Sequence, residues 1–206
     1  MKPLEDFVET LCDLSETLAI AGIDWAVAGA AAANMYRDQI RTTTDVDVIL
    51  SLSDRKVDVV LDALHREGWD SIDVVENWLL RAQHPVNGRL DVLISQTEYE
   101  LGALARAHTV SLAADHKCKT LAIEDVLILK LIADRYRDND DVESILVAQP
   151  KLDWNYLSKW LEEFDLDERL RRIEDNAIET GRLANKISRV PRQGGSTTEP
   201  KCGNRN

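Results

Sequence analysis

Two aspartates, Asp45 and Asp47, are the residues whose type and spacing most clearly point to chemistry. They begin a stretch, residues 45–50, in which carboxylates first alternate with aliphatic side chains, as in a β-strand. Residues two apart in a strand share a face, so both carboxylates point to the same side. Neighbouring carboxylates repel each other unless a cation lies between them, and Mg²⁺ is commonly held by carboxylates together with substrate phosphates. The pair therefore predicts a site for Mg²⁺ or Mn²⁺.

A third aspartate, Asp91, comes early in another predicted strand, residues 89–95. Three acids that converge from two strands could hold two metal ions about 3.5–4 Å apart, which is the arrangement used for in-line phosphoryl displacement. Asp91 could also accept a proton as a general base. The competing interpretation is a strand with solvated aspartates, which an isolated Asp-x-Asp pattern leaves open.

Groups suited to binding phosphate lie close to these acids in the sequence. Gly29 follows a predicted strand, residues 24–28, and precedes a short helix that starts at Ala30. The first backbone N–H groups of that helix and its positive end could meet an anion. Arg41, four residues before Asp45, could contact the same phosphates. With the acids, these positions favour a site for a metal-bound phosphate substrate.

Six positions follow one another in a characteristic order, namely Gly29, Ala32, Arg41, Thr43, Asp45 and Asp47. Farther along, the segment 124–130 is followed by Arg135 and by acids within 138–141. This order resembles the nucleotidyltransferase fold shared with DNA polymerase β, and more narrowly the abortive-infection (AbiEii-like) toxins of bacteria and archaea. That group has a strand, Gly, then Gly or Ser, and later Arg-x-Thr-x-Asp-x-Asp. The resemblance spans residues 20–147 of the chain.

The resemblance implies an α/β (α+β) protein, with a mixed β-sheet flanked by helices, a helical C-terminal part and a cleft between the two. It also implies the transfer of a nucleoside monophosphate from a nucleoside triphosphate to a hydroxyl acceptor, with release of pyrophosphate. The catalytic residues, which would also bind Mg²⁺ or Mn²⁺, would be Asp45, Asp47 and Asp91. The nucleotide would be bound by Gly29, Ala30, Arg41, Thr43 and Lys130. RNA, a protein or a small molecule stays open as the acceptor, and an antitoxin protein is a candidate partner.

One position departs from the pattern of that group. The group carries a second Gly or a Ser after the first Gly, whereas this chain has Ala30, which keeps the backbone N–H but lacks a hydroxyl. An alternative function is therefore a binding module that keeps the fold with weakened catalysis, such as one partner of a toxin–antitoxin pair. The retention of all three aspartates argues against it. A metal-dependent phosphohydrolase that uses the same acids is a third interpretation.

Lys130, on a helix predicted over residues 124–137, has two interpretations. It could be a surface lysine paired with Asp134 one turn later, or it could reach the nucleotide phosphates, as the resemblance suggests. The acids within 138–141 are favourable at the start of the next helix. The alternative for them is to orient Lys130 or Arg135.

Hydrophobic periodicity predicts strands that alternate with helices, followed by helices only. The predicted strands are 24–28, 45–50, 78–83, 89–95 and 108–112. The predicted helices are 1–20, 30–36, one between a cap at 53–54 and Gly68, then 98–107, 124–137, 138–147, 154–164 and 167–182. We expect a nucleotidyltransferase-type core over residues 1–122, a helical region over 123–182 and a flexible basic tail over 183–206.

The charge of the chain is negative and unevenly spread. Its 206 residues have a net charge of −12, which argues against a general nucleic-acid coat protein. Residues 182–206, however, hold six basic residues and one acid, and the segment 191–200 has no apolar period. A frayed, solvated terminus is the first interpretation of this tail. Docking on a nucleic acid or on the acidic body of the protein is the other.

The sequence also favours a cytoplasmic protein. Its three cysteines are far apart and odd in number, which is typical of reduced thiols. The first residues are acidic and lack a continuous apolar stretch, which argues against a secretory signal. Because no apolar run approaches the roughly 20 residues of a membrane helix, we expect no membrane partner.

Overall fold

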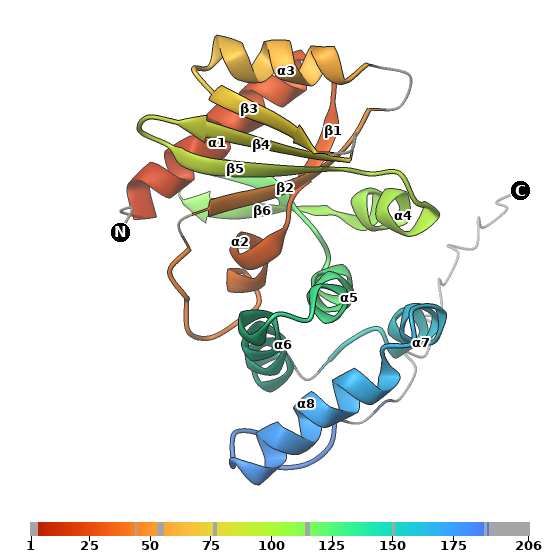
Figure 1. Ribbon diagram of the computed structural model, residues 1–206. Coiled ribbons are helices and arrows are strands. Elements are labelled where there is room, and N and C mark those ends of the chain that lie inside the picture. Colours follow the sequence, from red (N-terminus) through yellow and green to blue (C-terminus); the bar gives the residue numbers. More distant parts are fainter. Residues whose placement is uncertain are drawn as a thin grey trace, which may run out of the picture.

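The strands within the described residues form one seven-stranded mixed sheet in a computed structural model (Figure 1). The structure describes residues 4–43, 45–52, 56–75, 78–113, 116–149, 151–187 and 189. The strands are β1 (Asp24–Val27), β2 (Asp45–Ser51), β3 (Asp70–Val75), β4 (Leu79–His84), β5 (Gly88–Ile94), β6 (His108–Ala113) and β7 (His116–Thr120). Their order across the sheet is β3-β4-β5-β2-β1-β7-β6. This confirms the predicted fold class.

Eight helices surround the sheet within the described residues, and each face of it is covered. They are α1 (Leu4–Ile20), α2 (Gly29–Asn34), α3 (Val57–Arg66), α4 (Glu98–Arg106), α5 (Ile123–Ala133), α6 (Tyr136–Ala148), α7 (Trp154–Glu163) and α8 (Asp167–Glu179). In Figure 1, α1 crosses behind the sheet near α3, α2 leads toward α5 and α6, and α7 and α8 lie beyond them. The C-terminal part is therefore helical, as predicted.

Two strands, β3 and β7, were not predicted from the sequence. The segment of β7 reads His-Lys-Cys-Lys-Thr and has no aliphatic residue, yet Cys118 and Thr120 are buried while Lys117 is exposed. The strand pairs with β6 on one side and with β1 at Val27↔Thr120 on the other. The strand thus depends on pairing with its neighbours, of which β1 is distant in the sequence, and composition does not record such pairing.

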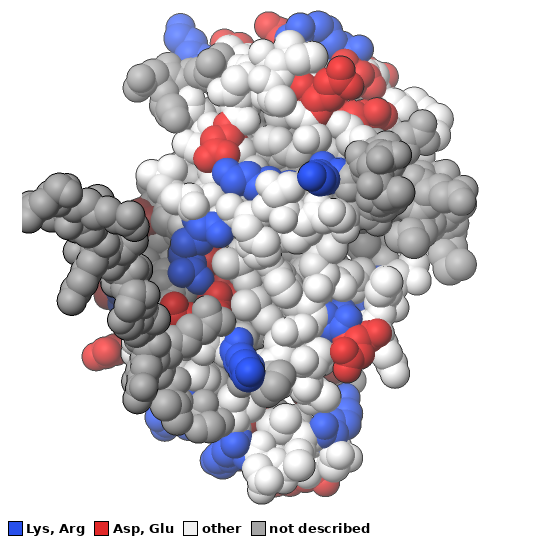
Figure 2. Space-filling view, turned by 180° about the vertical axis from the view of Figure 1, so that it is seen from behind, with Lys and Arg blue, Asp and Glu red and all other residues white. Residues whose placement is uncertain are grey.

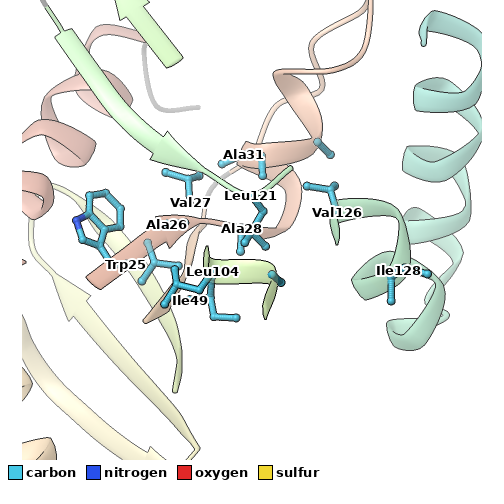
Figure 3. Packing of buried hydrophobic residues seen from close by; sticks show 14 of the residues in the cluster. Trp25, Ala26, Val27, Ala28, Ala31, Ile49, Leu104, Leu121, Val126 and Ile128 are labelled. Carbon is cyan, nitrogen blue, oxygen red and sulfur yellow. The ribbon is translucent and has the colours of Figure 1, made fainter. Parts of the chain in front are cut away.

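One hydrophobic core extends from the sheet into the C-terminal helices. The cluster includes Val27 on β1, Ala31 on α2, Leu121 before α5, and Val126 and Ile128 on α5 (Figure 3). The helical region therefore packs directly on the predicted core, without a linker between them. The division at residue 122 stays a prediction.

The predicted helix 124–137 is wrong at its C-terminal end. Helix α5 ends at Ala133, and Asp134 takes a left-handed conformation with φ of 49°. Arg135 caps the next helix: its backbone N–H donates to Asp138, and its guanidinium binds the same carboxylate. This side-chain interaction starts α6 at Tyr136 instead of extending α5.

Two basic residues, one at the end of the predicted helical region and one in the first part of the predicted tail, lie against the helices. Arg182 pairs with the buried Glu143 on α6 at 2.6 Å, and Arg189 pairs with the buried Glu174 on α8 at 2.6 Å. These pairs concern residues before the stretch 191–200, for which both interpretations, a frayed terminus and docking, stay predictions. The remainder of the predicted tail, 191–206, lies outside the described residues.

The space-filling view (Figure 2) shows how the charged side chains are distributed over one face of the molecule. From behind, the charged side chains of the described residues stand apart and leave a broad uncharged area (Figure 2). On that face they form no continuous basic surface for a phosphate backbone. Among the described helices, none has the length and apolar character to cross a membrane.

Candidate active site

The register of β2 and β5 brings the predicted carboxylates together in the middle of the sheet. The two strands are parallel neighbours, and Asp47 lies opposite Asp91. Asp45 lies opposite Arg89. These two residues come two positions before Asp47 and Asp91 on their strands and therefore lie on the same face. We call this side of the site, made of Asp45, Asp47, Asp91 and Arg89, the strand wall.

Gly29 forms the support of Asp47. Its φ of +58° lies in the left-handed region, and a Cβ built there would be 2.0 Å from Oδ2 of Asp47. Any larger residue would displace the carboxylate. The backbone N–H of Ala30 donates to the side chain of Asp47, so in this structure it holds a carboxylate and not an outside anion.

The charge of Asp47 is poorly compensated. Its pKa is raised, first because the carboxylate is buried and then because Asp91 carries a like charge beside it, while Lys130 and the N–H of Ala30 act in the opposite direction. A carboxylate pair in this state gains from a hard cation with oxygen ligands. The donor chemistry of Asp45 and Asp47 therefore fits Mg²⁺ or Mn²⁺.

Arg89 is a site residue that the sequence reasoning missed. Its guanidinium holds both oxygens of Asp91, with Nε at 2.8 Å from Oδ1 and Nη2 at 2.6 Å from Oδ2. In the part of the chain that is described, no three His, Cys, Asp or Glu side chains are arranged to hold a metal ion as they stand. The Arg-Leu-Asp spacing, which puts both side chains on one strand face, is the signal that could have revealed Arg89.

Lys130 is buried, so the interpretation of a surface lysine paired with Asp134 is wrong. It is 4% exposed, and its ammonium lies 2.7 Å from Asp138 and 2.8 Å from Asp141. Asp138 also binds Arg135 in the first turn of α6. The acids after α5 therefore begin a helix, and they also orient Lys130 and Arg135. The orienting role was the alternative interpretation from the sequence.

Asp141 gathers three cations and is completely buried. Besides Lys130, it accepts hydrogen bonds from Arg37 at 2.6 Å and from Nε and Nη2 of Arg41 at 3.1 Å each. Burial alone would raise the pKa of Asp141, but the hydrogen bonds from Lys130 and Arg41 outweigh it and lower the pKa. Arg37 had no signal in the sequence, because it lies in a loop outside any motif.

A cavity of about 580 Å³ separates the strand wall from this second group of residues. We call the second group, made of Arg37, Arg41, Lys130, Arg135, Asp138 and Asp141, the helix wall. The cavity is lined by Ala30, Arg41, Thr42, Thr43, Asp45, Asp47, Arg89, Asp91, Lys130, Arg135, Tyr136, Arg137 and Asp138. All predicted site residues line it except Gly29, which supports Asp47 from behind. A second hollow of about 740 Å³ lies along α8 and contains none of them.

Thr43 has a structural contact at the entrance to β2. Its hydroxyl donates to the backbone oxygen of Asp45 at 2.9 Å. This bond fixes the start of the strand that carries both metal-binding candidates. A direct contact of Thr43 with nucleotide stays a prediction.

The two walls offer different chemical groups to the cavity, and these groups define what the site can do chemically. The strand wall has carboxylate oxygens for a cation, and the helix wall has guanidinium and ammonium groups for phosphate oxygens. Phosphoryl chemistry is catalysed mostly by positioning and by neutralisation of charge, which needs these two kinds of group. The cavity is therefore suited to a metal-bound polyphosphate.

Comparison with solved structures shows that the chain has a nucleotidyltransferase fold. It is similar to a nucleotidyltransferase-like antigenic protein from Paracoccidioides brasiliensis, with a TM-score of 0.55 and 16% identity over 89% of this chain and 94% of that one. It is also similar to the antibiotic-resistance factor ANT(2'')-Ia, with a TM-score of 0.56 and 12% identity over 84% of this chain and 97% of that one. No protein-family model and no curated protein matches the chain. The narrower resemblance to abortive-infection toxins stays a prediction.

Proposed function

We propose that the protein is a metal-dependent nucleotidyltransferase, an enzyme that transfers a nucleoside monophosphate from a nucleoside triphosphate to a hydroxyl acceptor. One observation carries this proposal: Asp47 and Asp91 lie side by side on neighbouring strands and face the cations of the helix wall across a cavity. The nucleotidyltransferase fold of the chain supports it independently.

The residues have separate roles in the proposed reaction. Asp45 and Asp47 would hold the divalent cation, Mg²⁺ or Mn²⁺, and Asp91, whose oxygens are bound by Arg89, would complete the set. When bound, the metal ion neutralises phosphate charge and orients the reacting groups. Asp91 also accepts the proton of the acceptor hydroxyl, as a general base within reach of the cavity.

The helix wall binds the phosphates in this proposal. An ammonium group has three N–H donors, and two carboxylates take up two of those of Lys130, so one donor is left for a phosphate oxygen. Arg41 keeps part of its guanidinium toward the cavity, which it lines while Asp141 holds Nε and Nη2. The contribution of Ala30 is limited, because its N–H already donates to Asp47.

A binding module with weakened catalysis is the second candidate, and the contact between Arg89 and Asp91 favours it. A carboxylate whose two oxygens are both held by a guanidinium is less ready to bind a metal ion. The two candidates differ in a simple measurement. The enzyme binds Mg²⁺ or Mn²⁺ together with nucleotide, whereas a pure scaffold does not.

The acceptor and the biological setting belong to the proposal as well. The acceptor hydroxyl belongs to an RNA, a protein or a small molecule, and a toxin-type role with an antitoxin partner is the hypothesis that the sequence resemblance suggests. We place the reaction in the cytoplasm, since the three cysteines of the sequence are odd in number and far apart, which is typical of reduced thiols.

Label transfer tests the proposed function directly. The protein is incubated with each α-³²P-labelled nucleoside triphosphate, with Mg²⁺ or Mn²⁺, and with total RNA, total protein or a small-molecule extract. We expect label in one acceptor fraction and none with Asp47→Asn. Asp73→Asn is the matched control, because Asp73 is an exposed aspartate on the edge strand β3. Absence of both label transfer and metal-dependent nucleotide binding would overturn the proposal.

A further inference from the structure

Tyr136 is the one aromatic side chain that lines the cavity among the described residues. It is the first residue of α6 and is 83% exposed. Within the described part of the chain, its phenol makes no hydrogen bond and its ring contacts no other ring or cation. Other aromatic residues of the C-terminal part behave differently. Trp160 and Phe164, for example, stack on each other and lie edge-on to Tyr99.

The backbone that carries Tyr136 is rigidly held. Arg135, directly before it, is fixed by Asp138, which also binds the buried Lys130. Asp134 is held by Arg169 on α8 at 2.8 Å. The backbone of Tyr136 therefore lies on a turn that ion pairs hold next to the helix wall.

We propose that Tyr136 stacks on the nucleobase of the bound nucleoside triphosphate, an inference that rests on the proposed function. The ligand that brings phosphates to Lys130 and Arg135 also carries a planar ring, and Tyr136 follows Arg135 directly in the chain. Stacking between a base and an aromatic side chain contributes roughly tenfold or more to affinity for each base. An exposed ring without a partner in a charged cavity fits this role.

This role defines the substrate class more narrowly. Stacking uses the face of a base and not its hydrogen-bonding edge, so it tolerates different bases. Larger rings stack over a larger area, and purine nucleotides are therefore the preferred donors, with little discrimination between adenine and guanine. An acceptor with an aromatic ring is the competing occupant, and the test below separates it from the nucleobase.

Calorimetric titration of the full chain with Mg²⁺ tests the proposal. The ligands are a non-hydrolysable ATP analogue and inorganic tripolyphosphate, which has the phosphates without the base. We expect Tyr136→Ala to weaken binding of the ATP analogue about tenfold and to leave tripolyphosphate binding unchanged. Tyr136→Phe and Tyr136→Trp should retain the affinity of the wild type. Val86→Ala is the control, because Val86 is 74% exposed in the turn between β4 and β5, outside the cavity lining.

The outcomes separate this inference from the proposed function. If the wild type binds the ATP analogue and Tyr136→Ala binds it equally well, the stacking role is overturned while the proposed function stands; this is also the result if Tyr136 stacks on the acceptor. Equal losses for the analogue and tripolyphosphate would overturn it too, because the change would then act on the helix wall. If the wild type binds neither ligand, the stacking role is overturned, and the proposed function is overturned with it when label transfer is absent as well.

Discussion

The two walls of the cavity contain the same kinds of charged residues, but the walls differ in how far neighbouring cations neutralise their carboxylates. In the helix wall, each of two buried carboxylates meets at least two cations, and the pKa of Asp138 and of Asp141 is lowered even though burial acts to raise it. In the strand wall, Asp47 lies beside Asp91, and burial and this like charge raise the pKa of Asp47. The helix wall is complete within the protein, whereas the strand wall gains from a cation supplied from outside.

This difference separates residues that hold the site from residues that act in it. A buried ion pair contributes little net stability, but loss of one partner leaves a charge uncompensated and is costly. A pair of like charges behaves in the opposite way, since loss of one member relieves repulsion. Substitutions in the two walls should therefore have very different effects on the free energy of unfolding, and the following variants measure this.

Asp141→Ala should have the largest effect on stability. It removes the carboxylate shared by Arg37, Arg41 and Lys130, and among the described residues Arg37 forms an ion pair with no other carboxylate. We expect the free energy of unfolding to fall by about 3–5 kcal/mol in denaturant titrations. Asp140→Ala, one residue away and exposed, should change it by less than about 0.5 kcal/mol. Similar small losses in both variants would show that the helix wall is not the more tightly compensated one.

Gly29→Ala should have an intermediate effect on stability and should also weaken metal binding. The left-handed φ costs about 1–2 kcal/mol for a residue with a Cβ, and the new methyl group must also displace the Asp47 carboxylate. We therefore expect a moderate fall in melting temperature together with weaker binding of Mn²⁺, measured by electron paramagnetic resonance. Gly102→Ala is the control, since a Cβ at that position meets nothing within 4 Å. Unchanged Mn²⁺ binding in Gly29→Ala would argue against Asp47 as a ligand.

Asp47→Asn should have the smallest effect on stability and the largest on activity. The amide oxygen can still accept the N–H of Ala30, while the repulsion from Asp91 disappears. The free energy of unfolding should stay within about 0.5 kcal/mol of the wild type or increase. Mg²⁺ should raise the melting temperature of the wild type, because a ligand of the folded state stabilises it, but not that of the variant. A loss of stability as large as that of Asp141→Ala would assign Asp47 a structural role.

Local sequence determined the elements of the site and the residue types in them. Alternation along residues 45–50 was sufficient to place Asp45 and Asp47 on one face of a strand, because a period of two depends only on neighbouring residues. The order of Gly29, Arg41 and the two aspartates was sufficient to suggest the nucleotidyltransferase fold, which the structural comparison confirmed. The catalytic and binding roles of these residues stay predictions.

Only the tertiary structure decided which charges meet. The sequence offered Asp134 as the partner of Lys130, but the break after α5 turns the chain so that Asp138 and Asp141 reach it instead. The pairing of Asp47 with Asp91 required the register of two strands that are more than 40 residues apart in the sequence. Ion pairs and strand pairs are set by distances in space, and a local period has no information about them. The sequence therefore specified the acids and bases of this protein, while the packing of α5 and α6 against the sheet determined which of them are compensated.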